Sequence, residues 1–161
     1  MVTARPGSMA PKRRAASVPA PVGIDQCRLI ELPSVEDPQG NLAFAEGGRH
    51  VPFQIARAYH VYGVPAGAKR GGHAHREIEQ LVVCLRGDFE VAVDDGSRRG
   101  SFAVGDPRLA LYLPPMVWHD LTGFAADSAY YVVSSGLYDE GEYLRDREEF
   151  ERLARASSAA L

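Results

Sequence analysis

The sequence predicts an all-β barrel or sandwich that ends in one α-helix. From position 27 onward, short strand-like runs alternate with turn signals at intervals of about 8–12 residues, which is typical of such folds. Near the C-terminus, the spacing of apolar residues lengthens from two to three and four, as in an amphipathic helix. With 161 residues, the chain suits one domain with a substantial core.

The expected strands are rich in β-branched and aromatic residues and are separated by turn residues. Asp94, Asp95 and Gly96 predict a hairpin turn with a positive φ, in which both carboxylates are expected to be solvated. Pro114 and Pro115 end a strand, because proline cannot donate to the ladder. The expected strands cover residues 27–32, 41–46, 55–62, 80–85, 89–93, 101–104, 110–113, 118–122 and 129–134.

The tail predicts a helix from about Asp139 to about residue 156. Tyr143, Phe150 and Leu153 share one helical face, and acidic residues lie near the positive N-terminal end of the helix. Residues 1–22 are rich in Ala, Pro, Arg and Ser and lack apolar periodicity, so we expect a disordered head. The predicted organisation is this head followed by one domain over residues 23–157.

Composition excludes several classes of protein. The net charge of −3 with mixed signs gives no electrostatic reason to bind nucleic acid or a membrane surface. No apolar run approaches the length of about 18 residues that a membrane-spanning helix needs. No apolar segment follows the basic residues 12–14, so no secretory signal is predicted. Cys27 and Cys84 are too few for a disulfide framework, and a cytoplasmic protein fits best.

A histidine pair behind a glycine-rich turn is the most informative segment. His73 and His75 are two positions apart, so their side chains share one face of an extended backbone. They follow Gly71 and Gly72 and precede an apolar strand, which would aim both imidazoles into one cavity. Imidazole is the commonest metal ligand and titrates near neutrality. The pair therefore predicts either a metal site or a proton-transfer site.

The spacing around the pair matches the first cupin motif except at one position. Metal-binding cupins have glutamate where this chain has Gln80, and a neutral amide is a poorer donor to a divalent cation. The second cupin motif is echoed at residues 114–119, with methionine in place of glycine. His73, His75 and His119 alone could still hold zinc. Gln80 favours the proton-transfer interpretation and suits a hydrogen bond to a substrate hydroxyl or carbonyl.

A second strand offers groups that could stabilise an anion. Alternation places Arg57 and Tyr59 on one face, together with the apolar Ile55 and Val61. An arginine among apolar neighbours is costly unless an anion meets it. That anion could be an enediolate oxygen, a sugar-nucleotide phosphate or an acidic side chain of the protein. Arg70, in the turn before the histidines, is a second cation for the same purpose.

Trp118 and His119 follow the double proline at the start of a strand. The tryptophan is as consistent with a core residue as with a ring that stacks on a base or a sugar at the mouth of the barrel. His60 points away from Arg57 and Tyr59, so we expect it at the surface.

The chain resembles the sugar-nucleotide 3,4-ketoisomerases of the cupin superfamily, over about residues 27–150. The resemblance implies an all-β cupin barrel, that is, a double-stranded β-helix or jelly roll, with a C-terminal α-helix. The motifs that carry it are Gly40-Asn-Leu42, Pro52-Phe-x-Ile-x-Arg57-x-Tyr59, Tyr62-Gly-Val-Pro65, Arg70-Gly-Gly-His73-Ala-His75-Arg-Glu-x-x-Gln80, Asp94-Asp-Gly96, Pro114-Pro-Met-Val-Trp118 and Tyr138-Asp-Glu-x-x-Tyr143-x-Arg145.

This resemblance implies an isomerase that needs neither metal nor cofactor. Family members convert dTDP-4-keto-6-deoxyglucose to the 3-keto sugar, ahead of an aminotransferase in dideoxy-amino-sugar biosynthesis. They are homodimers, often with N-terminal strands exchanged between subunits. The family associates catalysis with the histidines that correspond to His73 and His75.

The chemistry agrees with this assignment. A base must take the C3 proton and an acid must protonate C4, and a histidine can do both. We expect Arg57 and Tyr59 to act with His73 and His75 by stabilising the enediolate, with Gln80 as a further donor. The expected substrate-binding residues are Arg70, Gln80, Trp118 and His119.

Three alternatives stay open. A 3,5-epimerase of a keto sugar nucleotide would need two acids on opposite faces and usually a His–Asp pair, which is not evident in this sequence. A metal-dependent cupin oxygenase would use His73, His75 and His119. A non-catalytic sugar-binding cupin would use the pair only to position a ligand.

Overall fold

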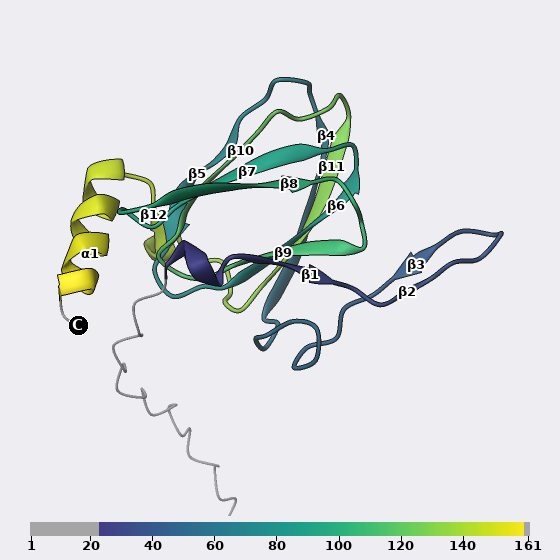
Figure 1. The fold of residues 1–161 in the computed structure, drawn as a ribbon, viewed down its shortest axis with the longest axis horizontal. Helices are drawn as coiled ribbons and strands as arrows, with labels where there is room; N and C mark the ends of the chain where they lie inside the picture. Colours follow the sequence, from purple (N-terminus) through teal and green to yellow (C-terminus); the bar gives the residue numbers. More distant parts are fainter. Residues whose placement is uncertain (1–22, 160–161) are drawn as a thin grey trace, which may run out of the picture.

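The computed structural model describes residues 23–159 and confirms the all-β jelly-roll architecture (Figure 1). Two five-stranded antiparallel sheets form the barrel. The first has the order β1 (Arg28–Glu31), β9 (Leu109–Leu113), β6 (Gln80–Arg86), β11 (Ser128–Ser134) and β4 (Arg57–Val64). The second has the order β12 (Tyr143–Leu144), β5 (Arg70–His75), β10 (Trp118–Thr122), β7 (Phe89–Asp94) and β8 (Arg99–Val104). The predicted head, residues 1–22, lies outside the described residues.

Each predicted strand overlaps a strand of the structure, but the run at 41–46 shortens to β3 (Leu42–Ala43). β3 pairs with β2 (Ser34–Val35) in a hairpin that projects from the barrel (Figure 1). The histidine segment is β5, and the hairpin turn between β7 and β8 has Gly96 at a φ of 88°, as expected. A short 3₁₀ helix, η1 (Ile24–Gln26), precedes the barrel.

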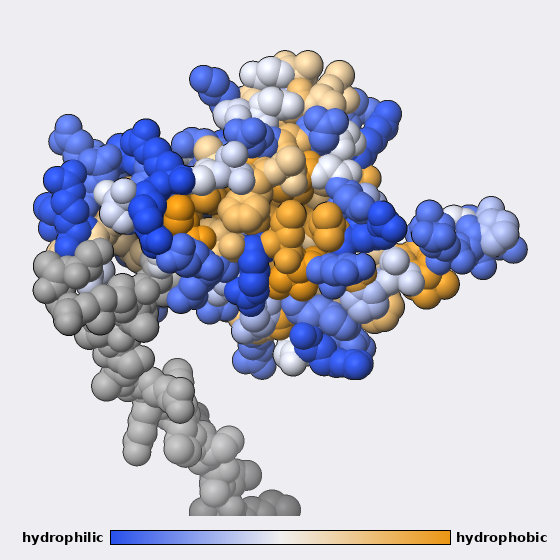
Figure 2. Space-filling view, viewed as in Figure 1, coloured by the Kyte–Doolittle hydropathy of each residue, from blue (hydrophilic) through white to orange (hydrophobic). Residues whose placement is uncertain are grey.

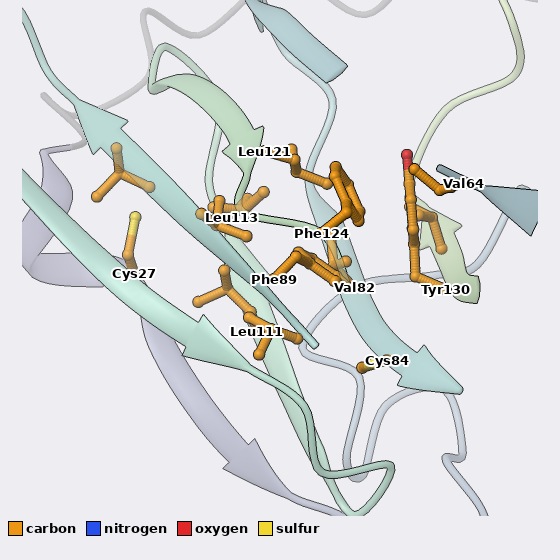
Figure 3. Close-up of a cluster of buried hydrophobic side chains, with 14 of the residues drawn as sticks. Cys27, Val64, Val82, Cys84, Phe89, Leu111, Leu113, Leu121, Phe124 and Tyr130 are labelled. Carbon is orange, nitrogen blue, oxygen red and sulfur yellow. The ribbon is translucent and has the colours of Figure 1, made fainter. Parts of the chain in front are cut away.

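The core lies between the two sheets, where alternate side chains of both meet (Figure 3). Burial of these side chains is the main favourable term for the fold, at roughly 25 cal/mol per Å² of apolar surface. The core contains an aromatic stack of Phe89, Phe124 and Tyr130, with Phe89 and Phe124 centroids 4.9 Å apart. This packing fills part of the interior, while polar side chains of β4 and β5 line a cavity.

The predicted helix begins later than expected. Asp139 accepts a hydrogen bond from the Gly141 amide in a 3₁₀ turn, η2 (Glu140–Glu142), and the chain then forms β12 before α1 (Arg147–Ala159) starts. The prediction was wrong over these first residues because Tyr143 continues the spacing of the true helical face by coincidence. Phe150 of α1 is fully buried against Trp118 on the outer side of the second sheet.

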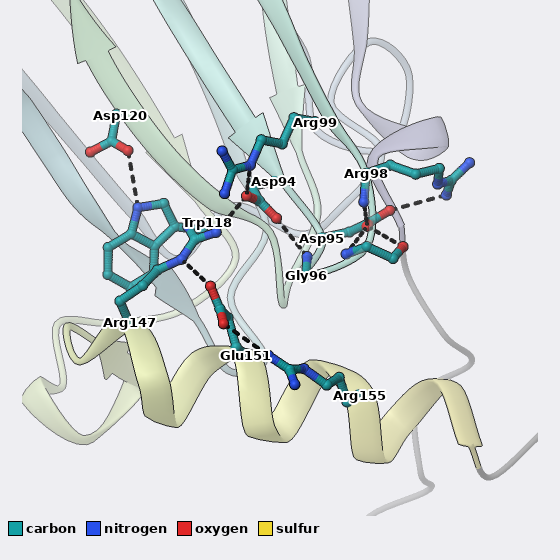
Figure 4. A network of polar contacts seen from close by, with 11 residues as sticks. Asp94, Asp95, Gly96, Arg98, Arg99, Trp118, Asp120, Arg147, Glu151 and Arg155 are labelled. Carbon is teal, nitrogen blue, oxygen red and sulfur yellow. Dashed lines mark hydrogen bonds and ion pairs between the residues drawn. The ribbon is translucent and has the colours of Figure 1, made fainter.

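The two turn aspartates are paired, which corrects the expectation that water solvates them (Figure 4). Asp94 accepts from Arg99 at 2.7 Å and forms an ion pair with Arg147 of α1. Asp95 accepts from the backbone amides of Ile24 and Arg98, so it ties η1 to the β7–β8 turn. These contacts hold both ends of the described chain on one edge of the barrel.

No helix of the described residues is long and apolar enough to cross a membrane.

We predict that Asp95→Asn destabilises the fold at pH 7 by about 2 kcal/mol, because it weakens hydrogen bonds to a charged group. Burial alone would raise the pKa of Asp95, but hydrogen bonds from Ser97, Arg98 and Ile24 outweigh it and lower that pKa. A lowered pKa stabilises the fold above the unfolded value near 3.8 and loses this contribution as the pH falls below it. Denaturant unfolding should therefore show the gap between wild type and variant narrowing from pH 7 to pH 3.

The matched control is Asp88→Asn, because Asp88 is an exposed aspartate in the turn before β7. We expect its unfolding free energy to follow that of the wild type at every pH. A gap for Asp95→Asn that stays constant from pH 7 to pH 3 would contradict the role given to its carboxylate.

Candidate active site

Strand β5 carries the histidine pair and is flanked by two partners that complete the site. His73 and His75 share the inner face, as predicted, with ring centroids 5.0 Å apart. In the register, His119 of β10 lies opposite His73, and Tyr143 of β12 lies opposite His75. Cross-strand neighbours of this kind are close enough for direct side-chain contact. The His73 and His119 centroids are 4.6 Å apart, and those of His75 and Tyr143 are also 4.6 Å apart.

Backbone carbonyls fix the proton positions on two of the three imidazoles. His73 Nδ1 lies 3.1 Å from the Gly71 carbonyl, and His119 Nδ1 lies 3.2 Å from the Val117 carbonyl. A carbonyl oxygen only accepts, so each Nδ1 carries the proton in the neutral ring. Each Nε2 is then left with a lone pair. His73 is only partly buried and lines the cavity described below, so its Nε2 can serve as a base there.

Burial keeps the three imidazoles neutral. It lowers the pKa of His73 and lowers the pKa of His119 to about 3. Burial also lowers the pKa of His75 to about 2, with further contributions from His119, His73 and Arg57. His75 is 3% exposed, and neither of its ring nitrogens has a hydrogen-bond partner. The cluster therefore holds unprotonated bases in a setting that disfavours positive charge.

Arg57 and Tyr59 point from β4 toward the histidines, as alternation predicted. Ile55 does not share their face, because it precedes β4 and lines a groove on the outer side of the sheet. Among residues 23–159, no carboxylate forms an ion pair with Arg57, so the structural ion pair weighed above does not form there. Arg57 Nη2 instead donates to Tyr143 Oη at 3.4 Å, and its buried Nε has no partner.

Gln80 holds the side chain of Tyr59 through a hydrogen bond. Its side chain is 3% exposed, does not line the cavity, and donates from Nε2 to Tyr59 Oη at 3.2 Å. Burial raises the pKa of Tyr59 to about 12, so this hydroxyl stays protonated. Gln80 thus holds Tyr59 in place, whereas the sequence suggested that it meets the substrate directly.

Trp118 and His119 lie on opposite faces of β10, because successive residues of a strand alternate. His119 joins the histidine cluster and is 5% exposed. Trp118 packs against α1 and donates from Nε1 to Asp120 at 3.0 Å. Of the two roles weighed for Trp118, the structure gives it the core role, away from the cavity.

A cavity of about 540 Å³ opens between β4, β5 and the tail. His73, Arg57 and Tyr59 line its inner wall. Lys69, Arg70 and Arg145 also line it, and Arg70 Nε donates to Tyr130 Oη at 3.1 Å. Four cations around one cavity make it a site for an anionic ligand. The lining is polar and aromatic, so it suits a ligand whose oxygen atoms form hydrogen bonds.

Seven residues lining the cavity were not among the predicted site residues, namely Val61, Lys69, Gly71, Tyr130, Tyr138, Tyr143 and Arg145. Tyr143 and Arg145 belong to a motif that carried the family resemblance, but their assignment to a helix hid their position. Tyr143 contacts both histidines, and the Arg145 guanidinium lies 4.5 Å from the Tyr143 ring centroid. Only the pairing of β12 with β5 reveals this contact.

The histidine cluster could also hold a metal ion. One nitrogen each from His73, His75 and His119 lies within 4.8 Å of the others. Three histidines match a known class of zinc site. Where metal-binding cupins supply a carboxylate, this chain has the neutral Gln80, whose amide is already bonded to Tyr59.

Comparisons with known proteins agree with this site. Residues 25–155 match the model of a family described as "FdtA: WxcM-like, C-terminal". A TDP-4-oxo-6-deoxy-alpha-D-glucose-3,4-oxoisomerase of Aneurinibacillus thermoaerophilus is 34% identical over 125 residues, which cover 78% of this chain and 90% of the relative.

Two solved structures share the fold over most of their length. The crystal structure of a 3,4-ketoisomerase from Helicobacter canadensis has a TM-score of 0.78 and 29% identity, covering 81% of this chain and 98% of that one. A mutant of the 3,4-ketoisomerase QdtA from Thermoanaerobacterium thermosaccharolyticum, solved with TDP-4-keto-6-deoxyglucose, has a TM-score of 0.78 and 28% identity, covering 81% and 94% of the two chains.

We predict that His73 and His119 are neutral Nδ1–H tautomers at pH 6. Because burial lowers the pKa of both rings below the usual 6.5, the folded protein takes up their protons only at lower pH. Long-range ¹H–¹⁵N NMR of the imidazoles should show one protonated and one bare nitrogen in each ring. The exposed His60, on the opposite face of β4, is the internal control for assigning the imidazole signals. Imidazolium signals from the cluster at pH 6 would contradict the assignment.

Proposed function

This chain belongs to the WxcM-like family that FdtA represents, and from that premise we propose that it converts TDP-4-keto-6-deoxyglucose to the TDP-linked 3-keto-6-deoxy sugar. It is an isomerase, like its named relatives. The observation that carries the proposal is a neutral imidazole, His73, with its Nε2 free at a cavity lined by cations. The pathway is the synthesis of dideoxy amino sugars, in which an aminotransferase consumes the 3-keto product.

His73 acts as the base. Its Nε2 takes the C3 proton, and the electrons of that bond form the enediolate. Arg57 and Tyr59 stabilise the negative charge on the enediolate oxygens, since both line the same wall. Burial, with a further contribution from Arg145, lowers the pKa of the resulting imidazolium, so it is a stronger acid than an exposed one. It therefore returns the proton readily, to C4.

His75 and His119 position His73 and keep its surroundings dry. Both are buried beside its ring, at centroid distances of 5.0 and 4.6 Å. His75 also contacts Tyr143, which contacts His73 as well, so the three rings pack against one another. Removing either ring would open a cavity next to the base and cost precision in its placement.

Lys69, Arg70 and Arg145 provide the binding site for the pyrophosphate of the nucleotide. All three line the cavity and are exposed enough to meet a ligand from solution. Guanidinium groups bind phosphate oxygens through paired N–H donors. The sugar would then reach toward His73 on the inner wall.

The reaction needs no metal in this proposal. Proton transfer uses the lone pair on His73 Nε2, and a metal held by the histidine cluster would occupy it. Gln80 supports this view, because it replaces the carboxylate that would offset a divalent charge.

We also place the protein in the cytoplasm, where its two free buried cysteines suit a reducing compartment.

We propose that the protein is a homodimer joined through the outer face of the first sheet. This face is apolar like the inner one, and Val51 and Phe53 cover only part of it. The rest forms a groove of about 420 Å³ lined by residues such as Ile55, Leu85 and Tyr131. Both faces of a sheet this apolar are normally covered. A second copy of this chain would cover the exposed part of the outer face.

The β2–β3 hairpin is the segment that would be exchanged. It projects from the barrel, and its base carries Val35, Leu42 and Phe44 at 53%, 58% and 40% exposure. Figure 2 shows this hydrophobic base beside a hydrophilic tip. A hairpin with so little support of its own is marginal in water. Docking on a partner's apolar groove would stabilise it.

We predict that the enzyme, dialysed against EDTA, forms the 3-keto sugar from TDP-4-keto-6-deoxyglucose, as seen by NMR of the product. His73→Asn should lower turnover by about 100-fold or more, because it removes the base. Its affinity for TDP should change little, because the phosphate contacts remain.

His60→Asn is the matched control, since His60 is exposed on the opposite face of β4 and should leave turnover unchanged. Full activity of His73→Asn would rule out His73 as the base. An EDTA-treated wild type that makes no 3-keto product, and that zinc or iron restores, would overturn the metal-free mechanism.

We predict that Leu42→Glu weakens the dimer, because it puts a charge into the apolar base of the hairpin. Light scattering after gel filtration should give twice the 17.5 kDa chain mass for the wild type and a mass nearer one chain for the variant. Gln39→Glu adds the same charge at the polar hairpin tip and should stay dimeric. A monomeric wild type, or a variant as dimeric as the control, would contradict the proposed interface.

A further inference from the structure

An exposed tyrosine ring lies at the rim of the cavity, where the cavity opens to solvent. Tyr138 follows β11 and precedes η2, lines the cavity and is 64% exposed. Its neighbour in the chain, Leu137, is 70% exposed. Tyrosine combines a large apolar ring with a polar tip, which suits it to contacts with a ligand at such a boundary. The proposed isomerisation gives Tyr138 no role.

We propose that Tyr138 is the platform on which the base of the nucleotide stacks. This inference rests on the proposed function, in which Lys69, Arg70 and Arg145 bind the pyrophosphate of a nucleotide sugar. The sugar occupies the inner wall of the cavity beside His73, so the base, at the other end of the ligand, lies toward the rim. Every nucleobase has a π-face, and stacking on an aromatic side chain is a common way for proteins to hold one.

The contacts of Tyr138 within the chain leave much of its ring open. The Arg57 guanidinium lies 5.6 Å from the ring centroid, and the centroid of Tyr143 lies 5.7 Å away. The two tyrosine rings are inclined at 50°, so they do not stack on each other. Because Tyr138 is 64% exposed despite these neighbours, a planar ligand can approach its ring from solvent.

A shared carboxylate fixes the ring beside the pyrophosphate site. Tyr138 Oη donates to Glu140 Oε2 at 2.6 Å, and Arg145 Nε donates to Oε1 of the same carboxylate at 2.9 Å. Glu140 therefore links the ring to one of the cations that would bind phosphate. A deoxyribose separates the base of a nucleotide from its phosphates, so the two protein contacts have to be adjacent but distinct. A ring held in place before the ligand arrives also loses little side-chain entropy on binding.

The other tyrosine rings of the cavity are less accessible to a base. Tyr130 is 6% exposed and belongs to the aromatic stack of the core. Tyr59 is half-buried against the core, and Tyr143 is half-buried against the histidine pair. Tyr62 is 76% exposed but does not line the cavity. Tyr138 combines both properties that a stacking platform needs, exposure and a place in the lining.

Stacking at the rim would contribute affinity without choosing between bases, because it does not depend on the hydrogen-bonding edge of the base. Its use to the enzyme is to hold the far end of the substrate. Binding energy from a part of the substrate that does not react can position the part that does. With the base on Tyr138 and the pyrophosphate on the cations, the sugar is confined to the wall that carries His73.

Calorimetric titration of the full chain with TDP and with inorganic pyrophosphate tests the proposal. Tyr138→Ala should weaken TDP binding by about 10-fold or more, because it removes the stacked ring. Its affinity for pyrophosphate should stay within about twofold of the wild type, because the three cations remain. Tyr138→Phe keeps the ring and should bind TDP within about threefold of the wild type. In NMR spectra, the ring current should move the thymine protons of bound TDP upfield in the wild type and in Tyr138→Phe, but not in Tyr138→Ala.

Tyr62→Ala is the matched control, since Tyr62 is an exposed tyrosine outside the cavity and its loss should change neither affinity. The proposal is overturned if Tyr138→Ala binds TDP within about twofold of the wild type. It is also overturned if Tyr138→Ala loses TDP and pyrophosphate by the same factor, which would mean that Tyr138 acts by holding Arg145 through Glu140. A Tyr138→Phe variant as weak as Tyr138→Ala would assign the contact to the hydroxyl and overturn it too. A wild type that binds TDP with the upfield shift but makes no 3-keto product would support the platform and reject the proposed function, so the two failures are distinguishable.

Discussion

The site depends on the antiparallel pairing of β5 between β10 and β12. This pairing sets His73 against His119 and His75 against Tyr143, so the register alone assembles four rings from three strands. The approach of β10 is close: a Cβ on Gly71 would lie 2.5 Å from the His119 carbonyl oxygen. Gly71 also has a φ of 79°, which other residues adopt only with strain. Gly71 is therefore required for β5 to pair with β10 in this register.

Much of the barrel and half of the site could be predicted from the sequence, because side chains along a strand alternate between two faces with a period of two residues. That period correctly put His73 with His75 and Arg57 with Tyr59, because each pair lies within one strand. The same rule could have separated Trp118 from His119, since neighbours on a strand face opposite sides. Treating both as substrate-binding residues overlooked this constraint.

The remaining residues of the site could not be predicted from local pattern. Tyr143 meets β5 only through pairing across a long stretch of sequence, and no period within the tail reports it. Its spacing to Phe150 agrees with a helix, but Tyr143 belongs to β12 and α1 begins only at Arg147. Gln80 was placed correctly on its strand, but its hydrogen bond to Tyr59 depends on the order of strands β6, β11 and β4 in the first sheet. The contacts of these two residues are determined by the long-range pairing of strands, which local propensity does not report.

The position of β12 has a consequence for how the site is assembled along the chain. Strands β5 and β10 bring the three histidines together, and the cavity gains a further wall where β12 pairs with β5. The same tail buries Phe150 of α1 against Trp118 of β10. The docking of the tail and the closure of the cavity are therefore coupled, and a change that weakens the packing of α1 also weakens the wall that carries Tyr143.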